Sequence, residues 1–101
     1  MIQLLITTGD DRREVRIDDD EPVTIGRSPE NALPLPDHRL SRKHARIEWD
    51  DLGFRLKDLC SSNGTWLNRR RIESDRLIQG DEIRVGGVII HVLKLRLPVT
   101  K

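Results

Sequence analysis

The apolar positions of this chain come in short alternating runs and do not follow helical spacing. Ala45, Ile47 and Trp49 alternate with charged residues, which is the pattern of a strand with one buried face. No window of ten residues repeats apolar positions at the helical period of about 3.6 residues. Strand-like runs recur about every 8 to 12 residues. The predicted strands cover residues 2–6 (with 7 and 8 as an extension), 14–17, 22–25, 45–49, 54–57, 66–68, 82–85 and 88–97.

Turn-forming residues separate these runs. Gly86-Gly87 predicts a two-residue hairpin turn. Residues 32–36 contain two prolines and can form only an edge strand, because proline lacks the N–H that a central strand donates. Residues 69–71 are expected to form a basic turn, and residues 72–75 a connection. Together the pattern predicts an all-β sandwich or barrel.

The length of 101 residues predicts a single domain spanning 1–101. Lys plus Arg number 18 against 17 acidic residues, so no overall positive field attracts nucleic acid. Cys60 is the one cysteine, which excludes an intrachain disulfide and a cysteine-based zinc cluster. The apolar run at 2–6 is too short for a signal sequence or a membrane span. We therefore expect a cytoplasmic protein with no cofactor, metal, nucleic-acid or membrane partner, and a monomer as the default state.

One loop concentrates polar chemistry. Ser61–Thr65 places three hydroxyls and the Asn63 amide between apolar neighbours. Upstream, Gly26-Arg27 ends a predicted strand and the run 41–44 (Ser-Arg-Lys-His) precedes another, so both can supply cations and donors. A phosphothreonine carries about −1.5 to −2 charges and three acceptor oxygens, and is bound by such groups. Each part has a simpler reading, since Asn63-Gly64 also suits any tight hairpin.

Taken together, these motifs resemble the forkhead-associated (FHA) domain. The matching residues are Gly26-Arg27, Ser41-x-x-His44, Ser62-Asn63-Gly64-Thr65-x-x-Asn68 and Leu77-x-x-Gly80-Asp81-x-Ile83. The resemblance covers residues 23–92. It implies a β-sandwich of about eleven short strands, whose loops at one end bind phosphothreonine peptides in Ser/Thr kinase signalling. Arg69 stands where the family usually has glycine, which leaves the form of that turn open.

The resemblance also implies individual roles. Phosphopeptide contacts are expected from Arg27, Ser41, Arg42, Ser62 and Asn63. Arg39 is expected to influence specificity by binding an acidic side chain three places after the phosphothreonine. Loop architecture is assigned to Gly26, His44, Gly64, Thr65 and Asn68, with His44 joining the Ser41 loop to the Ser62 loop.

Three other functions are compatible with parts of the sequence. A basic cluster, Arg69-Arg70-Arg71, could suggest nucleic-acid binding. Without interleaved aromatics, however, such a cluster is typical of a solvated surface. Ser41 and His44 could suggest a hydrolase, but the pair lacks an orienting acid in a known arrangement, an oxyanion device and a nucleophile elbow, so no catalytic residue is predicted. The main alternative is a phosphate-independent interaction domain that uses a face of the sandwich.

Overall fold

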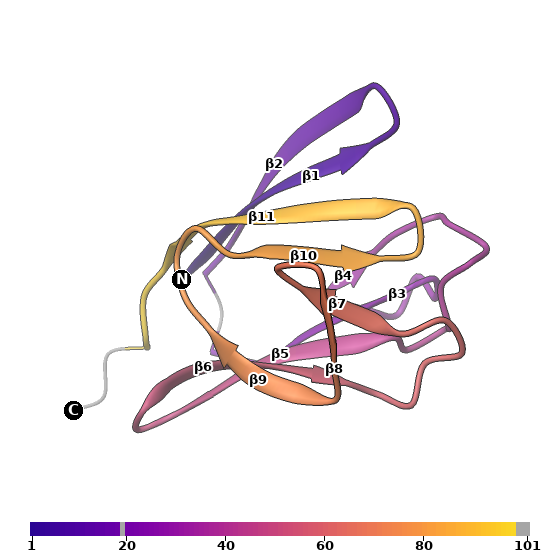
Figure 1. Ribbon diagram of the computed structural model, residues 1–101. Coiled ribbons are helices and arrows are strands. Elements are labelled where there is room, and N and C mark those ends of the chain that lie inside the picture. Colours follow the sequence, from indigo (N-terminus) through magenta and orange to yellow (C-terminus); the bar gives the residue numbers. More distant parts are fainter. Residues whose placement is uncertain (19, 99–101) are drawn as a thin grey trace.

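Two β-sheets form the protein. The computed structural model describes residues 1–18 and 20–98, and within them it contains eleven strands and no helix. A six-stranded sheet, in the order β2-β1-β11-β10-β7-β8, packs on a five-stranded sheet, in the order β4-β3-β5-β6-β9 (Figure 1). The expected all-β sandwich is confirmed. Residues 19 and 99–101 of the predicted domain lie outside the described residues.

The strand bounds are as follows. The six-stranded sheet contains β1 (Ile2–Thr8), β2 (Asp11–Ile17), β7 (Thr65–Leu67), β8 (Arg70–Ile72), β10 (Glu82–Val85) and β11 (Val88–Leu95). The five-stranded sheet contains β3 (Val23–Gly26), β4 (Leu33–Pro34), β5 (Ala45–Asp50), β6 (Gly53–Asp58) and β9 (Ser74–Leu77). All pairings are antiparallel except that of β3 with β4.

The core lies between the two sheets. Alternate residues of β1 and β5 point into it, as the alternating pattern predicts: Leu4 and Ile47 have no exposed surface. Trp49 and Phe54 pair across the β5–β6 hairpin, with their ring centroids 5.9 Å apart. Burial of this apolar surface is the main stabilising term, at about 25 cal/mol per Å². This buried core holds the strands in place, and the loops project from the ends of these strands.

The clearest errors among the predicted strand boundaries are the start of β2 and the end of β11. β2 begins at Asp11 and not at residue 14, because Gly9, at φ 61°, and Asp10 form a two-residue turn that pairs Thr8 with Asp11. The first half of β2 is exposed, so it shows no apolar alternation and is held by backbone pairing to β1. β11 ends at Leu95 and not at residue 97, since Leu95 pairs with Ile2 at the start of β1.

The predicted basic turn at 69–71 and the connection at 72–75 are also wrong. Asn68 and Arg69 alone form the turn, with φ values of 49° and 70°. β8 then pairs with β7, and β9 pairs with β6 in the other sheet. These strands are short and mostly polar, so only their partners reveal them.

Two further expectations are confirmed. β4 lies at the edge of its sheet, as its proline requires. Gly86, at φ 56°, and Gly87 form the two-residue β10–β11 turn, with Val85 opposite Val88. Within the described part of the chain, no helix is long and apolar enough to cross a membrane.

Candidate functional site

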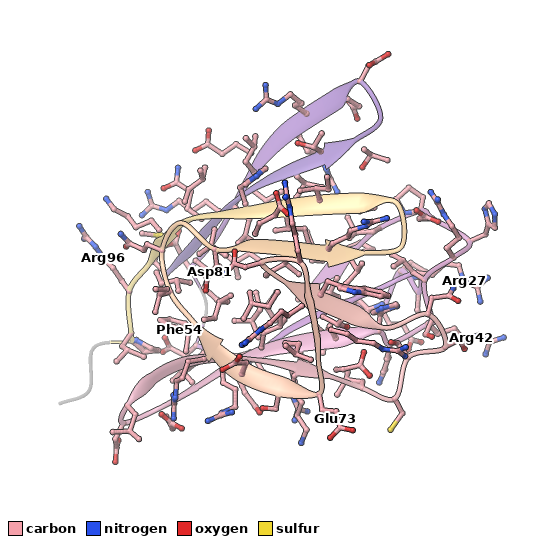
Figure 2. The ribbon with its side chains drawn as sticks, viewed as in Figure 1. Arg27, Arg42, Phe54, Glu73, Asp81 and Arg96 are labelled. Carbon is pink, nitrogen blue, oxygen red and sulfur yellow. The ribbon has the colours of Figure 1, made fainter. Side chains whose placement is uncertain are left out.

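The residues singled out by the motifs gather at one end of the sandwich. Figure 2 shows Arg27 and Arg42 together at that end, with Phe54 and Arg96 at the opposite end. Arg27 follows β3 directly, Arg42 lies between β4 and β5, and the loop 59–64 joins β6 to β7. Because this last loop crosses from one sheet to the other, the tight-hairpin interpretation of Asn63-Gly64 is wrong.

Close backbone approach brings the two arginine-bearing segments together. The Arg27 amide donates to the Ser41 carbonyl over 3.0 Å, and the Ser28 amide donates to the Arg42 carbonyl over 3.2 Å. A Cβ atom at Gly26 would lie 2.2 Å from the Arg42 carbonyl oxygen. Glycine is therefore needed at position 26 because any side chain would push these segments apart.

No sequence pattern singled out Asn31, which ties the same segments together. Its Nδ2 donates to the Ser28 carbonyl over 2.8 Å and to the Arg42 carbonyl over 2.7 Å. The residue is 6% exposed, so these bonds are shielded from water. The only local sign was its place in a turn-forming run, which says nothing about a partner eleven residues away.

His44 links the Ser41 segment to the loop 59–64. It has no exposed surface. Its Nδ1 accepts from the Ser41 amide over 3.2 Å, and its Nε2 lies 2.7 Å from the Gly64 carbonyl oxygen. A carbonyl can only accept, so Nε2 carries the proton and the ring is neutral. Both ring nitrogens are occupied, and neither is available as a base for the Ser41 hydroxyl.

Two more bonds join these loops. The Ser62 amide donates to the Ser41 hydroxyl oxygen over 3.1 Å. The Asn63 Nδ2 donates to the Arg39 carbonyl over 2.7 Å. Ser62 and Asn63 are both exposed, and Ser41 is half-buried. Since the Ser41 oxygen accepts from a backbone amide, its hydroxyl proton stays available for another acceptor.

Asp58, which the sequence did not reveal, organises the loop 59–64. Its carboxylate accepts from the Ser61 amide over 3.2 Å, the Ser61 hydroxyl over 2.5 Å and the Thr65 hydroxyl over 2.7 Å. Burial acts to raise the pKa of the Asp58 carboxyl, but the hydrogen bonds from Ser61 and Thr65 outweigh it and leave the pKa below its usual value. The Ser61 hydroxyl oxygen in turn accepts from the Gly64 amide over 3.0 Å.

Arg39 lies beside the β10–β11 turn and is paired with Asp37. The Asp37 carboxylate accepts from the Arg39 side chain at 3.0 and 3.1 Å, and from the Gly87 amide over 2.9 Å. The hydrogen bonds from the Arg39 side chain hold the pKa of Asp37 well below its usual range, although burial opposes this. The Arg39 side chain remains 58% exposed, so its outer edge is accessible to a ligand.

The remaining architectural residues are not all in one place. Thr65 is buried at the start of β7 and bonds to Asp58. Asn68 lies in the β7–β8 turn, where it donates to Asp81 over 2.9 Å and accepts from the Glu82 amide over 2.9 Å. Asn68 therefore shapes that turn and not the loop 59–64.

Arg27 and Arg42 are not neutralised by an ion pair with any described residue, although the acidic residue Glu30 lines the same cleft. Both side chains are exposed, and neither forms an ion pair within the described residues. They line an open cleft together with Ser28, Pro29, Glu30 and Lys43. In the same part of the chain, no group of three His, Cys, Asp or Glu side chains could hold a metal ion. The cleft thus offers cations and small donors to an anion.

The motif residues of this chain lie in a region that is similar to known proteins. The FHA domain sequence model matches residues 23–86. The Corynebacterium diphtheriae oxoglutarate dehydrogenase inhibitor is 41% identical over 68 residues, which are 66% of this chain and 48% of that protein. The glycogen accumulation regulator GarA of Mycolicibacterium smegmatis is 38% identical over 68 residues, 66% of this chain and 43% of that protein. The chain thus matches just under half the length of these curated relatives.

Solved FHA domain structures match a larger share of this chain than the curated relatives do. The FhaA FHA domain, solved in complex with the intracellular domain of Rv3910, has a TM-score of 0.80 and 34% identity, covering 91% of this chain and 99% of that one. An FHA domain solved in work on phosphothreonine-dependent interactions has a TM-score of 0.74 and 32% identity, covering 94% of this chain and 99% of that one. With more than half of its residues matched by the family's sequence model and with this shared sandwich, the chain belongs to the FHA domain family.

Proposed function

We propose that this domain binds phosphothreonine in a peptide or protein, and that Arg27 and Arg42 are the cations that hold the phosphate. The observation that carries the proposal is the backbone interlock between the two segments. The Arg27 amide and the Ser41 carbonyl are 3.0 Å apart, so two exposed and unpaired arginines leave the same rigid end of the sandwich. Charge-assisted bonds to phosphate from such a pair are about twice as strong as neutral ones.

The neighbouring groups supply neutral donors. Ser41 donates its hydroxyl proton to the phosphate, since its oxygen already accepts from the Ser62 amide. The exposed Ser62 hydroxyl adds a second donor. Asn63 uses one amide proton on the Arg39 carbonyl, which leaves its other proton and its oxygen for the main chain of the bound peptide. Gly26, His44, Gly64 and Thr65 hold these loops in place.

Arg39 is proposed as a specificity residue whose positive charge is partly balanced by Asp37. Its guanidinium is already hydrogen-bonded to Asp37 at 3.0 and 3.1 Å. An acidic side chain of the peptide would therefore meet a partly neutralised pair. We expect a weak acidic preference at that position in place of a strict requirement.

The setting of the domain follows from the same chemistry. Phosphothreonine is made by Ser/Thr kinases, so the domain acts in kinase signalling. We propose as well that it acts in the cytoplasm, as one folded unit spanning 1–101. The FHA domain solved in work on phosphothreonine-dependent interactions, which is 32% identical to this chain, supports the binding of phosphothreonine. The phosphorylated protein that it binds is to be found by screening.

The test is calorimetric titration with a degenerate phosphothreonine peptide library, followed by single peptides in phosphorylated and unmodified forms. We expect a Kd in the micromolar range for the phosphorylated form, which is about −8 kcal/mol, and no measurable binding of the unmodified form. Equal affinity for the two forms would contradict the proposal. It would favour the alternative, a phosphate-independent interaction through a sandwich face.

A further inference from the structure

A row of side chains crosses the outer face of the six-stranded sheet beside the proposed phosphate site. Trp66 on β7 pairs with Arg71 on β8 and with Arg84 on β10. Residues paired across strands point to the same face. The neighbours of Trp66 along β7, Thr65 and Leu67, are buried, so this row points outward. Arg84 also pairs with the half-buried Ile89 on β11. We call these four residues, Arg71, Trp66, Arg84 and Ile89, the outer-face strip.

In the described part of the chain, the two arginines of the strip are not held in ion pairs. Within the described residues neither forms an ion pair, whereas five other arginines do: Arg16, Arg39, Arg46, Arg70 and Arg76. Trp66, Arg84 and Ile89 line a groove together with Arg69 and Glu82. Glu82 is the acid in that groove, and its carboxylate lies 3.4 Å from His91 Nε2. The strip therefore combines an indole with two available cations.

Arg71 connects the strip to the loop 59–64. Its Cζ lies 5.6 Å from the centre of the Trp66 ring, within the range of a cation–π contact. Its Nε lies 2.7 Å from the point where a Cβ of Gly64 would stand. The guanidinium is thus held between the indole and the loop that carries Ser62 and Asn63. A cation held in this way loses less conformational freedom when it binds.

We propose that the outer-face strip docks an acidic segment of the phosphorylated partner, one that also carries an aromatic or large apolar side chain. The proposal rests on the phosphothreonine binding proposed above. Carboxylates of the segment pair with Arg71 and Arg84, and its apolar side chain covers Trp66 and Ile89. Adjacent strands are about 4.8 Å apart, so the two arginines are separated by roughly 10 Å. An extended peptide, rising about 3.3 Å per residue, covers that distance with three or four residues.

Single-stranded nucleic acid is the other ligand that binds basic surfaces with aromatic rings. It needs successive stacking platforms along a positively charged groove. The strip has one ring, and the Glu82 carboxylate borders its groove. These two observations favour an acidic peptide.

The probe is the phosphothreonine peptide selected by library screening, extended at either end by Gly-Glu-Asp-Phe-Glu. The matched control carries Gly-Gln-Asn-Phe-Gln, which keeps the shape and removes the charge. We expect the acidic extension at one end to lower Kd about three- to twentyfold relative to the control extension, as two exposed ion pairs and one aromatic contact would. The gain should shrink as salt rises from about 50 to 500 mM, because exposed charges are screened.

Variants decide whether the strip causes the gain. In the double variant Arg71→Gln/Arg84→Glu, the ratio of the two Kd values should fall below about twofold. Arg70→Gln should keep the full ratio, since Arg70 is on the same strand but is 82% exposed and pairs with Asp75. No gain in the wild type, or a gain that survives the double variant, would overturn the proposal. The proposal would also be overturned if labelled oligothymidylate bound through the same arginines more tightly than the acidic extended peptide.

Failure of the proposed function would look different. In that case the core peptide would bind equally with threonine and phosphothreonine. The acidic and amide extensions would then be compared on the unmodified peptide, and a gain that depends on Arg84 would still support the strip. Absence of that gain as well would reject both proposals.

Discussion

His44 and Gly64 join two loops that are twenty residues apart in the chain. The His44 Nε2 donates to the Gly64 carbonyl oxygen over 2.7 Å, and neither residue is exposed. Because Nδ1 of the same ring accepts from the Ser41 amide, one buried imidazole determines the distance between the Ser41 segment and the loop that carries Ser62.

His44→Ala should therefore lower stability and binding together. It removes two buried hydrogen bonds and leaves a cavity, which costs about 2–4 kcal/mol of unfolding free energy. Phosphopeptide affinity should fall as well, because the loops are no longer joined. Urea melts and calorimetry measure the two effects. His38→Ala is the matched control, since His38 is exposed, and it should change neither.

Arg27→Ala should affect binding alone. Arg27 is exposed and forms its structural bond through its backbone amide, which alanine keeps. Loss of the guanidinium should cost about 1.5–3 kcal/mol of binding free energy, the range for hydrogen bonds to a charged group. The melting temperature should stay at the wild-type value. Arg12→Ala removes another exposed arginine, on β2 and outside the site, and serves as the control. Wild-type affinity in Arg27→Ala would argue that the phosphate binds elsewhere.

Arg69→Gly should stabilise the fold. Arg69 has φ 70°, in the left-handed region that costs an ordinary L-residue about 1–2 kcal/mol. Glycine removes this strain but adds backbone freedom to the unfolded chain, so we expect a net gain of about 0.5–1 kcal/mol. Thermal melting measures it. Arg70→Gly, in the paired strand β8, should instead lower the melting temperature, and a loss of stability in Arg69→Gly would show that the turn is unstrained.

Asp37 should contribute to stability at neutral pH and lose that contribution in acid. Its pKa is lower in the folded protein than in the unfolded chain, because it accepts hydrogen bonds from the Arg39 side chain and the Arg39 and Gly87 amides. The unfolded chain therefore takes up the proton first, and stability falls as pH drops below about 4. Asp37→Asn should be less stable than the wild type at pH 7. The difference should narrow at pH 3 in urea melts, and a constant difference would contradict the assignment.

The domain should prefer phosphothreonine to phosphoserine. The two share one phosphate, so the arginines do not separate them, and the difference is a single methyl group. Burying one methyl is worth about 0.8 kcal/mol, and an unfilled space in the phosphoserine complex adds to it. We expect a preference of about 1–3 kcal/mol in paired titrations of one peptide sequence. Equal affinities would mean that the loops bind the phosphate alone.

The alternation of apolar and polar residues was enough to predict most strands and an all-β sandwich or barrel, and the resemblance to the FHA domain then selected the sandwich. It works for β1, β5 and β11 because each buries one face, and burial restricts residue type at every second position. The resemblance of the motifs to the FHA family also predicted that the loops carrying Ser41 and Ser62 meet. Gly26 ends β3, and Ser41 and Ser62 lie in the loops before β5 and β7.

Only the tertiary structure decided which side chains hold the site together. Asp58 bonds to Ser61 and Thr65 because the loop 59–64 folds back onto the end of β6. Asn31 and Asp37 bond to groups that become neighbours only when separate loops pack side by side. The same holds for β8 and β9, which are too short and polar to show a period and exist through pairing with β7 and β6. The row of Arg71, Trp66 and Arg84 likewise depends on strand register, because cross-strand contacts are set by through-space pairing and leave no local trace in the sequence.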